Sequence, residues 1–249
     1  MAKRNKKQVV NDRWEKKEQR GRKTSEQHMD KRKDVINKSP IRPLNDKQKQ
    51  YLWDCRNKKV NIATGFAGSS KTYIPTRVAI EKLLLEEIER IIIVRPPVSG
   101  SQSLGFFGGS KIEKCLNWIM PVVDTLNEFL GSNNVINLIE NDVIVPVPLE
   151  TIKGCSFKNC FIIVDEAEDL TPKEFIKCVT RLGTNSTIVF AGDILQTDLQ
   201  SKNGLHLAKE LIEHKGLDWG HANFDNYDDI VRDEEVKKTI IALTELGYM

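Results

Sequence analysis

The stretch NIATGFAGSSKTYIPTRVAIEKLL, residues 61–84, holds the clearest structural signal in the sequence. It begins with strand-type residues and ends with apolar side chains at helical spacing, so it predicts a strand, a tight loop and a helix. Gly65 and Gly68 allow the loop to bend so that successive N–H groups point at phosphate oxygens, and the helix adds its N-terminal dipole. We expect Lys71 to reach the β- and γ-phosphates of a nucleotide and the Thr72 hydroxyl to bind Mg²⁺.

This loop departs from the usual phosphate-binding signature at one position, because Ser70 stands where a glycine normally precedes the lysine. Serine is small and favourable near helix starts, so the exchange is tolerated if the residue needs no positive φ. Taken alone, the loop is compatible with a working nucleotide site, an inactive one or a coincidence. The residues that we expect to contact the nucleotide are Gly65, Phe66, Ala67, Gly68, Ser69, Ser70, Lys71 and Thr72.

Two further apolar strands end in polar residues that suit the same site. Residues 160–164 are followed directly by Asp165 and Glu166, and residues 187–191 are followed by a Gly-Asp pair and then by Gln196. Ligand sites in parallel sheets lie outside the carboxyl ends of the strands. We expect Asp165 to hold Mg²⁺, Glu166 to polarise the attacking water and Gln196 to contact the γ-phosphate or that water.

Strand-type and helix-type segments alternate along the chain, which predicts a three-layer α/β domain with a mostly parallel sheet. The β-branched runs without polar alternation are typical of strands covered on both faces. Pro121 is expected to kink or break a helix, and residues 135–148 to form strands around a turn at residues 141–142. The main predicted strands are 60–64, 90–96, 160–164 and 187–191, and the main predicted helices are 46–57, 71–89, 111–130 and 171–182.

Charge divides the chain into two parts. Residues 1–42 hold 15 Lys/Arg and 6 Asp/Glu, whereas the remaining residues hold 23 and 29. The basic arm has few large apolar residues, so we expect disorder in isolation, followed by one domain over residues 43–249. Such an arm either attracts nucleic-acid phosphates or acts as a solubilising or partner-binding tail.

The location of the protein is predicted from its cysteines and hydropathy. Five scattered cysteines favour buried thiols in a reducing compartment. No apolar run approaches the roughly 18 residues that a membrane span needs. We therefore expect a cytoplasmic protein, in the host cytoplasm if a bacteriophage encodes it, with no membrane partner.

Eight ordered segments resemble the PhoH family, RecA-like ATPases related to the N-terminal core of superfamily 1 helicases. The resemblance covers roughly residues 43–240 and suggests a stand-alone member of bacteriophage origin. The segments are LNDKQKQY, GFAGSSKT, VRPPVSGSQSLGFFGG, PLETIKG, IIVDEAED, TPKEFIKCVTRLG, GDILQTDL and DDIVR.

The resemblance implies a RecA-like fold and a Mg²⁺-dependent ATPase coupled to RNA or single-stranded nucleic acid, with helicase-like remodelling as one form of that coupling. Gln48 matches a glutamine that reads the adenine edge, and Tyr51 is a nearby stacking candidate. Arg181 and Arg232 match family arginines, either of which is expected to reach a γ-phosphate. Because the chain has no room for a second RecA-like domain, we expect a homo-oligomer, a hexameric ring, in which one of these arginines acts in trans.

Two alternative functions stay open. One is a catalytically weak, nucleotide-dependent RNA-binding scaffold in which Ser70 or a missing arginine abolishes turnover. The other is a nucleoside kinase of the thymidine kinase type, which also joins a phosphate loop to an element like DEAQ. That family usually carries a zinc site of four cysteines, which the cysteine spacing here does not supply.

Overall fold

The computed structural model describes residues 32–96, 119–152, 154, 156–197 and 202–247. The chain divides into two compact units, Met1–Pro40 and Ile41–Met249. In the first unit, residues 32–38 are helical, although the composition of the arm favours disorder. Asp34 and Lys38 have the i,i+4 spacing that supports an isolated helix. The more N-terminal part of the arm lies outside the described residues.

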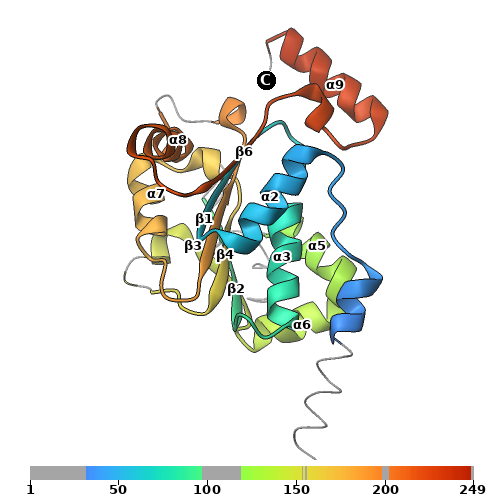
Figure 1. Ribbon diagram of the computed structural model, residues 1–249, viewed down its shortest axis with the longest axis vertical. Coiled ribbons are helices and arrows are strands. Elements are labelled where there is room, and N and C mark those ends of the chain that lie inside the picture. The colour runs from blue at the N-terminus through green and yellow to red at the C-terminus, as the bar shows by residue number, and fades with distance from the viewer. Residues whose placement is uncertain (1–31, 97–118, 153, 155, 198–201, 248–249) are drawn as a thin grey trace, which may run out of the picture. The chain divides into compact units, whose positions relative to one another are not determined.

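A six-stranded parallel sheet forms the centre of the second unit (Figure 1). The strand order is β3-β2-β4-β5-β1-β6, so β5 lies between β1 and β4, and the carboxyl ends of these three strands are neighbours. This topology confirms the predicted three-layer RecA-like α/β fold. The strands are β1 (Val60–Gly65), β2 (Arg90–Arg95), β3 (Ile144–Pro148), β4 (Cys160–Val164), β5 (Thr187–Ala191) and β6 (Gly220–Phe224).

Helices cover both faces of this sheet (Figure 1). One face carries α2 (Asp46–Asn57), α3 (Tyr73–Leu84), α5 (Met120–Leu130) and α6 (Ser132–Glu140). The other face carries α7 (Pro172–Val179) and α8 (Gly204–Lys215). The last helix, α9 (Glu234–Glu245), adds Ile240 to a small cluster with Phe66 and Ile230. Among the described residues, short 3-10 helices form part of the connections: η2 (Leu149–Ile152), η3 (Ala167–Asp169), η4 (Ile194–Gln196) and η5 (Tyr227–Asp229).

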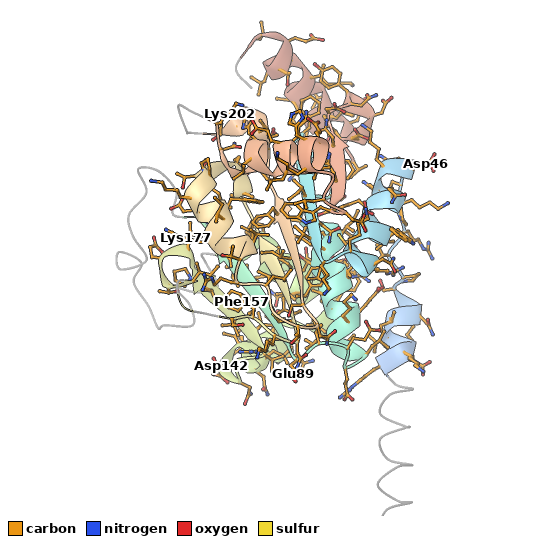
Figure 2. All side chains as sticks on the ribbon, turned by 60° about the vertical axis from the view of Figure 1, so that its left-hand side comes forward. Asp46, Glu89, Asp142, Phe157, Lys177 and Lys202 are labelled. Carbon is orange, nitrogen blue, oxygen red and sulfur yellow. The ribbon has the colours of Figure 1, made fainter. Side chains whose placement is uncertain are left out.

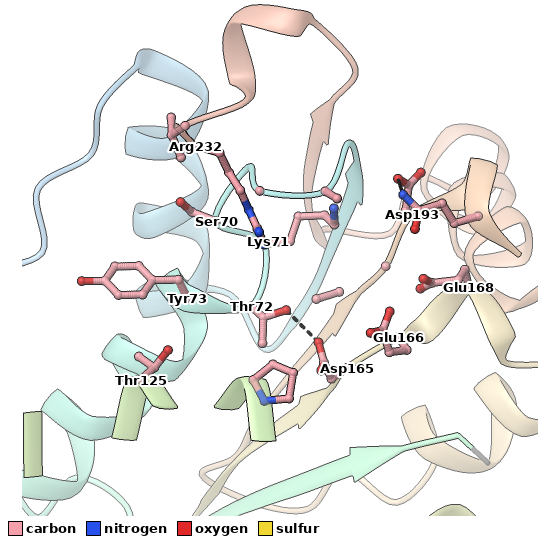
Figure 3. A pocket seen from close by; sticks show the side chains of 17 residues that line it. Ser70, Lys71, Thr72, Tyr73, Thr125, Asp165, Glu166, Glu168, Asp193 and Arg232 are labelled. Atoms are coloured by element: carbon pink, nitrogen blue, oxygen red, sulfur yellow. Dashed lines mark hydrogen bonds between the residues drawn. The ribbon is translucent and has the colours of Figure 1, made fainter. Parts of the chain in front are cut away.

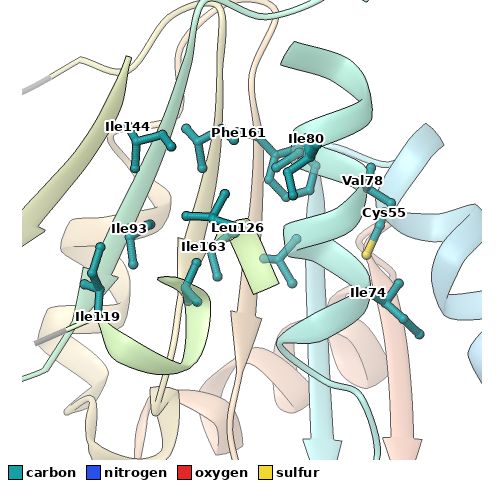
Figure 4. Packing of buried hydrophobic residues seen from close by; sticks show 14 of the residues in the cluster. Cys55, Ile74, Val78, Ile80, Ile93, Ile119, Leu126, Ile144, Phe161 and Ile163 are labelled. Carbon is teal, nitrogen blue, oxygen red and sulfur yellow. The ribbon is translucent and has the colours of Figure 1, made fainter. Parts of the chain in front are cut away.

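The core follows from the two-residue repeat of the strands. Ile93 and Ile163 point to the face covered by α3 and α5, where they join Val78 and Leu126 in one buried cluster (Figure 4). Ile162 belongs to the separate cluster under α7 and α8. Both faces of the central strands are therefore apolar, which explains their continuous hydrophobic runs.

Several predicted elements differ from the structure. The first residues of the segment 135–148 belong to α6, where Val135 and Ile139 are buried one helical turn apart, so a helical period was mistaken for strand material. Pro121 opens α5 and does not kink it, because the first helical turn needs no N–H from that residue. The predicted helix residues 111–118 lie outside the described part of the chain.

The amino ends of the strands form the edge of the sheet opposite the expected site. Glu89, Asp142 and Phe157 each precede a strand and lie at this edge (Figure 2). The backbone N–H of Glu89 donates to the carbonyl of Asn159 at 2.7 Å, which ties the starts of β2 and β4 together.

Candidate nucleotide site

A cavity of about 470 Å³ lies at the carboxyl edge of the sheet. Its walls come from the loop after β1, the turns after β4 and β5, the start of α5 and the segment before α9 (Figure 3). The structure thus gathers most of the predicted site residues around one space. Its polar and charged lining includes Ser70, Lys71, Thr72, Tyr73, Thr125, Asp165, Glu166, Glu168, Asp193, Gln196 and Arg232.

Lys71 supplies an ammonium group inside the loop. Its Nζ donates hydrogen bonds to the carbonyl oxygens of Gly65 at 2.6 Å and Phe66 at 2.7 Å. Burial lowers the pKa of Lys71, while the charges of Asp193 and Glu168 act in the opposite direction. The loop carbonyls and the surrounding carboxylates therefore hold a cation where a polyphosphate would need one.

Two glycines give this loop its shape. Gly65 and Gly68 have φ angles of +117° and +81°, a region that L side chains rarely adopt. A Cβ atom at Gly65 would collide with the carbonyl of Phe224, and one at Gly68 would collide with the side chain of Arg232. The glycines are therefore required by both conformation and space. Gly65, Phe66 and Ser69 shape the loop and are not among the residues that line the cavity.

Ser70 does not meet the condition under which serine replaces glycine at no cost. Its φ is +70°, in the left-handed region, so the condition for a tolerated exchange, a residue that needs no positive φ, is not fulfilled. A non-glycine residue in this region carries a penalty of roughly 1–2 kcal/mol. The amide Nε2 of Gln48 lies 3.5 Å from Ser70 Oγ, a long hydrogen bond that offsets little of this strain.

The strain predicts that a glycine will stabilise the loop. We expect Ser70→Gly to raise the free energy of unfolding by about 1 kcal/mol, because it removes the left-handed penalty. The matched control is Ser69→Gly, which deletes a buried hydroxyl that donates to the Phe66 carbonyl at 2.8 Å and should destabilise by about 1 kcal/mol. Urea unfolding measures both changes. A Ser70→Gly variant less stable than the unmodified chain would contradict the strain.

A carboxylate and a hydroxyl form the expected metal site. Thr72 Oγ1 donates to Asp165 Oδ1 at 2.7 Å, which joins the loop after β1 to the end of β4 (Figure 3). Burial raises the pKa of Asp165, although the hydrogen bond from Thr72 opposes this. Two adjacent hard oxygen donors beside a polyphosphate cavity suit Mg²⁺, which binds through one or two protein oxygens and substrate phosphates. The residues present fit the ion.

Glu166 enters the cavity from the next position. Its backbone has a φ of +52°, which turns the side chain away from the line of β4. Its Oε1 forms an ion pair with Arg95 Nη2 at 2.9 Å. This pair could not be predicted from the sequence, because it depends on β2 and β4 being neighbours in the sheet.

Several residues in the cavity wall have no role assigned from the sequence, among them Tyr73, Glu168 and Asp193. Glu168 and Asp193 are both 4% exposed, and Tyr73 is partly exposed at the start of α3. Asp193 Oδ2 accepts a hydrogen bond from Gln196 Nε2 at 3.0 Å, so this predicted contact residue is oriented by a buried acid. Asp193 comes one residue after the buried strand β5, a signal similar to the one that identified Asp165. Glu168 lacks such a signal.

Gln48 and Tyr51 lie beneath the loop and do not line the cavity. Tyr51 is 1% exposed, and its hydroxyl donates to the Lys71 carbonyl at 2.8 Å, so it is not available to stack on a base as expected. Gln48 is 2% exposed, and its Oε1 accepts from the Leu44 N–H at 2.9 Å. Both side chains support the loop from the α2 side.

The two candidate arginines lie at opposite edges of the sheet. Arg232 lines the cavity of its own chain and packs on Gly68. Arg181 follows the end of α7, at the amino edge of the sheet. Its backbone carbonyl accepts a hydrogen bond from the N–H of Phe157 at 3.0 Å, and Phe157 lies at that edge (Figure 2). Of these two arginines, Arg232 lines the cavity of its own chain and Arg181 does not.

Comparisons with known proteins identify sequence relatives of this chain. The family model "PhoH-like protein" matches residues 40–244. A PhoH-like protein of Synechocystis sp. is 32% identical over 87% of this chain and 67% of its own length. A PhoH-like protein of Bacillus subtilis is 34% identical over 78% of this chain and 61% of its own, and Protein PhoH of Escherichia coli is 34% identical over 67% and 48%. The chain thus spans only about half to two thirds of these relatives.

This chain also has a lower structural similarity to a solved structure, a Sulfolobus solfataricus SWI2/SNF2 ATPase core in complex with dsDNA. It has 16% sequence identity and a TM-score of 0.41, and the match covers 81% of this chain and 43% of that one. Within the described residues, no helix combines the length and apolar character needed to cross a membrane. The bacteriophage origin suggested by the sequence stays a prediction.

Proposed function

We propose that this chain, which belongs to the PhoH family, is a magnesium-dependent ATPase coupled to the binding or remodelling of RNA or single-stranded nucleic acid. The observation that carries the proposal is the 2.7 Å contact between Thr72 Oγ1 and Asp165 Oδ1. This contact brings the phosphate-binding loop and the acidic end of β4 to one cavity.

The charged and polar residues of the cavity have separate roles in the proposed reaction. Lys71 and the loop N–H groups bind and neutralise the phosphates, and Arg232 adds a second cation at the rim. Thr72 and Asp165 would hold Mg²⁺, which when bound neutralises charge on the phosphate oxygens. Glu166 accepts a hydrogen bond from the attacking water and orients it, and Gln196 contacts that water or the terminal phosphate.

Nucleic acid is the proposed second ligand. The arm over residues 1–42 carries 15 basic and 6 acidic residues, a charge excess suited to nonspecific phosphate contacts. Such contacts release counterions, so binding should weaken steeply as salt rises. Deleting residues 1–42 should reduce the affinity for RNA and the salt dependence together.

A ring of several copies is the proposed assembly. One RecA-like domain leaves its nucleotide open on one side, and a neighbouring subunit would close it. Arg181 lies at the edge of the sheet away from its own cavity, so it is the better candidate for an arginine supplied in trans. A hexamer is the expected size, and the mass in solution with an ATP analogue tests it.

The second candidate function is a catalytically weak, nucleotide-dependent RNA-binding scaffold. The observation that favours it is Ser70, whose φ of +70° places a strained residue directly before Lys71. If this strain misplaces the lysine during turnover, the chain would bind nucleotide and RNA but hydrolyse slowly. Ser70→Gly would then increase turnover.

One assay separates these functions. We expect Mg²⁺-dependent phosphate release from ATP that ceases when EDTA removes the metal and rises when RNA or single-stranded DNA is added. Duplex DNA added separately serves as the comparison. ATP binding without phosphate release under every condition would favour the scaffold, and the absence of ATP binding would overturn both functions.

A further inference from the structure

Glu168 is a buried acid whose place in the cavity calls for an explanation. It belongs to η3, lines the cavity beside Glu166 and is 4% exposed (Figure 3). Its Oε2 is fully buried and has no hydrogen-bond partner among the described residues. A Cβ atom at Gly192 would collide with this oxygen, so the backbone after β5 encloses the carboxyl group on one side.

The charged groups around Glu168 are mainly negative. Glu166 follows β4, Asp193 follows β5, and Lys71 faces them from the loop after β1. The helix α8, which also packs against η3, contributes apolar side chains such as Leu205 to the neighbouring core. Burial first, and then the Glu166 carboxyl beside it, raise the pKa of Glu168 to about 8.

A charged carboxylate at this place would be costly in two ways. Its Oε2 would be buried without a partner, and the charge would repel both Glu166 and an incoming triphosphate. The backbone N–H groups of Glu168 and Asp193 favour the charged form but offset only part of this cost. A neutral carboxylic acid removes the repulsion, lowers the cost of burying Oε2 and gains an O–H donor. The acceptor beside it is Glu166, with which the Glu168 side chain shares a hydrogen bond. Glu166 Oε1 also forms the ion pair with Arg95.

We infer that Glu168 is a positioning residue that acts as a neutral carboxylic acid, donating its O–H to the Glu166 carboxylate. Together with Arg95, it holds Glu166 in one orientation toward the attacking water. This role rests on the proposed ATP hydrolysis. No proton is transferred from Glu168 during turnover.

The kinetic test compares two substitutions across pH. Glu168→Gln keeps an uncharged donor, so it should retain roughly 10-fold more kcat than Glu168→Ala, with KM for ATP similar in both. In the unmodified chain kcat should fall as the pH rises through about 8, and this decline should be absent in Glu168→Gln. Glu210→Gln on the exposed face of α8 is the control and should leave the pH profile unchanged.

A second readout needs neither nucleotide nor turnover. Carbon-13 NMR of the Glu168 carboxyl should show a titration near pH 8. Because the folded-state pKa is raised, the stability that the neutral acid contributes is present at low pH and lost as the pH rises toward 8. The Tm of Glu168→Gln should therefore exceed that of the unmodified chain by a margin that grows between about pH 5 and pH 8.

The outcomes distinguish this inference from the proposed function. A Glu168 signal that titrates in the ordinary range for glutamate, or equal loss of kcat in Glu168→Gln and Glu168→Ala, would overturn the positioning role while leaving the ATPase intact. ATP binding with no phosphate release at any pH would overturn the ATPase and the role together. In that case a titration near pH 8 would still identify the neutral acid.

Discussion

Glu166→Gln is expected to lower the rate of phosphate release by about 100-fold or more while ATP binding changes little. Glutamine has nearly the same shape, but its amide is a poor acceptor for the proton of the attacking water. The ion pair with Arg95 is lost as well, although the Arg95 side chain is mostly buried and keeps its place at the end of β2. Single-turnover phosphate release and equilibrium ATP binding measure the two properties separately.

The matched control for Glu166→Gln is Glu213→Gln. Glu213 is also a carboxylate paired with a cation, Lys209, at 3.8 Å, but it lies on the outer surface of α8. We expect its turnover to equal that of the unmodified chain. If Glu166→Gln hydrolyses ATP as fast as this control, Glu166 does not orient the water.

Lys71→Ala is expected to have the second large effect, on nucleotide affinity. A charge-assisted hydrogen bond contributes about 1.5–3 kcal/mol, so its loss should weaken ATP binding by roughly 10- to 100-fold and reduce turnover further. The alanine also leaves the carbonyls of Gly65 and Phe66 without their donor. Binding of a fluorescent ATP analogue measures the change.

Lys202→Ala serves as the control for Lys71→Ala. Lys202 is 74% exposed and pairs with Glu210 on the surface, so its removal should leave ATP affinity within experimental error. Circular dichroism should show that both variants keep their helix content. An unchanged affinity in Lys71→Ala would show that the loop does not bind the nucleotide through this lysine.

The fold was predictable where a single physical signal governs each segment. The central strands are buried on both faces, so Ile91–Val94 and Phe161–Val164 read as continuous apolar runs. Strand β6 was missed because it lies at an edge of the sheet and contains the polar residues His221 and Asn223. The segment around Val135 was misread because a short apolar sequence fits either period.

Site residues could be predicted from the sequence where the carboxyl end of a buried strand is enough to determine their position. Lys71 and Asp165 follow buried strands, so parallel geometry was enough to bring them together. The φ of Ser70 depends on the path of the whole loop, and the burial of Glu168 depends on Gly192, which arrives from β5. Such properties arise only when separate segments meet, so they could not be read from local sequence.

The most direct test of the shared metal and phosphate pocket is electron paramagnetic resonance of Mn²⁺ in place of Mg²⁺. With ATP present, we predict a protein-bound Mn²⁺ signal with coupling to phosphorus, and its loss in Asp165→Asn at the same concentrations. Lys71→Ala should weaken the signal in parallel with ATP binding. Bound Mn²⁺ that shows no phosphorus coupling, or a signal unchanged in Asp165→Asn, would contradict the account.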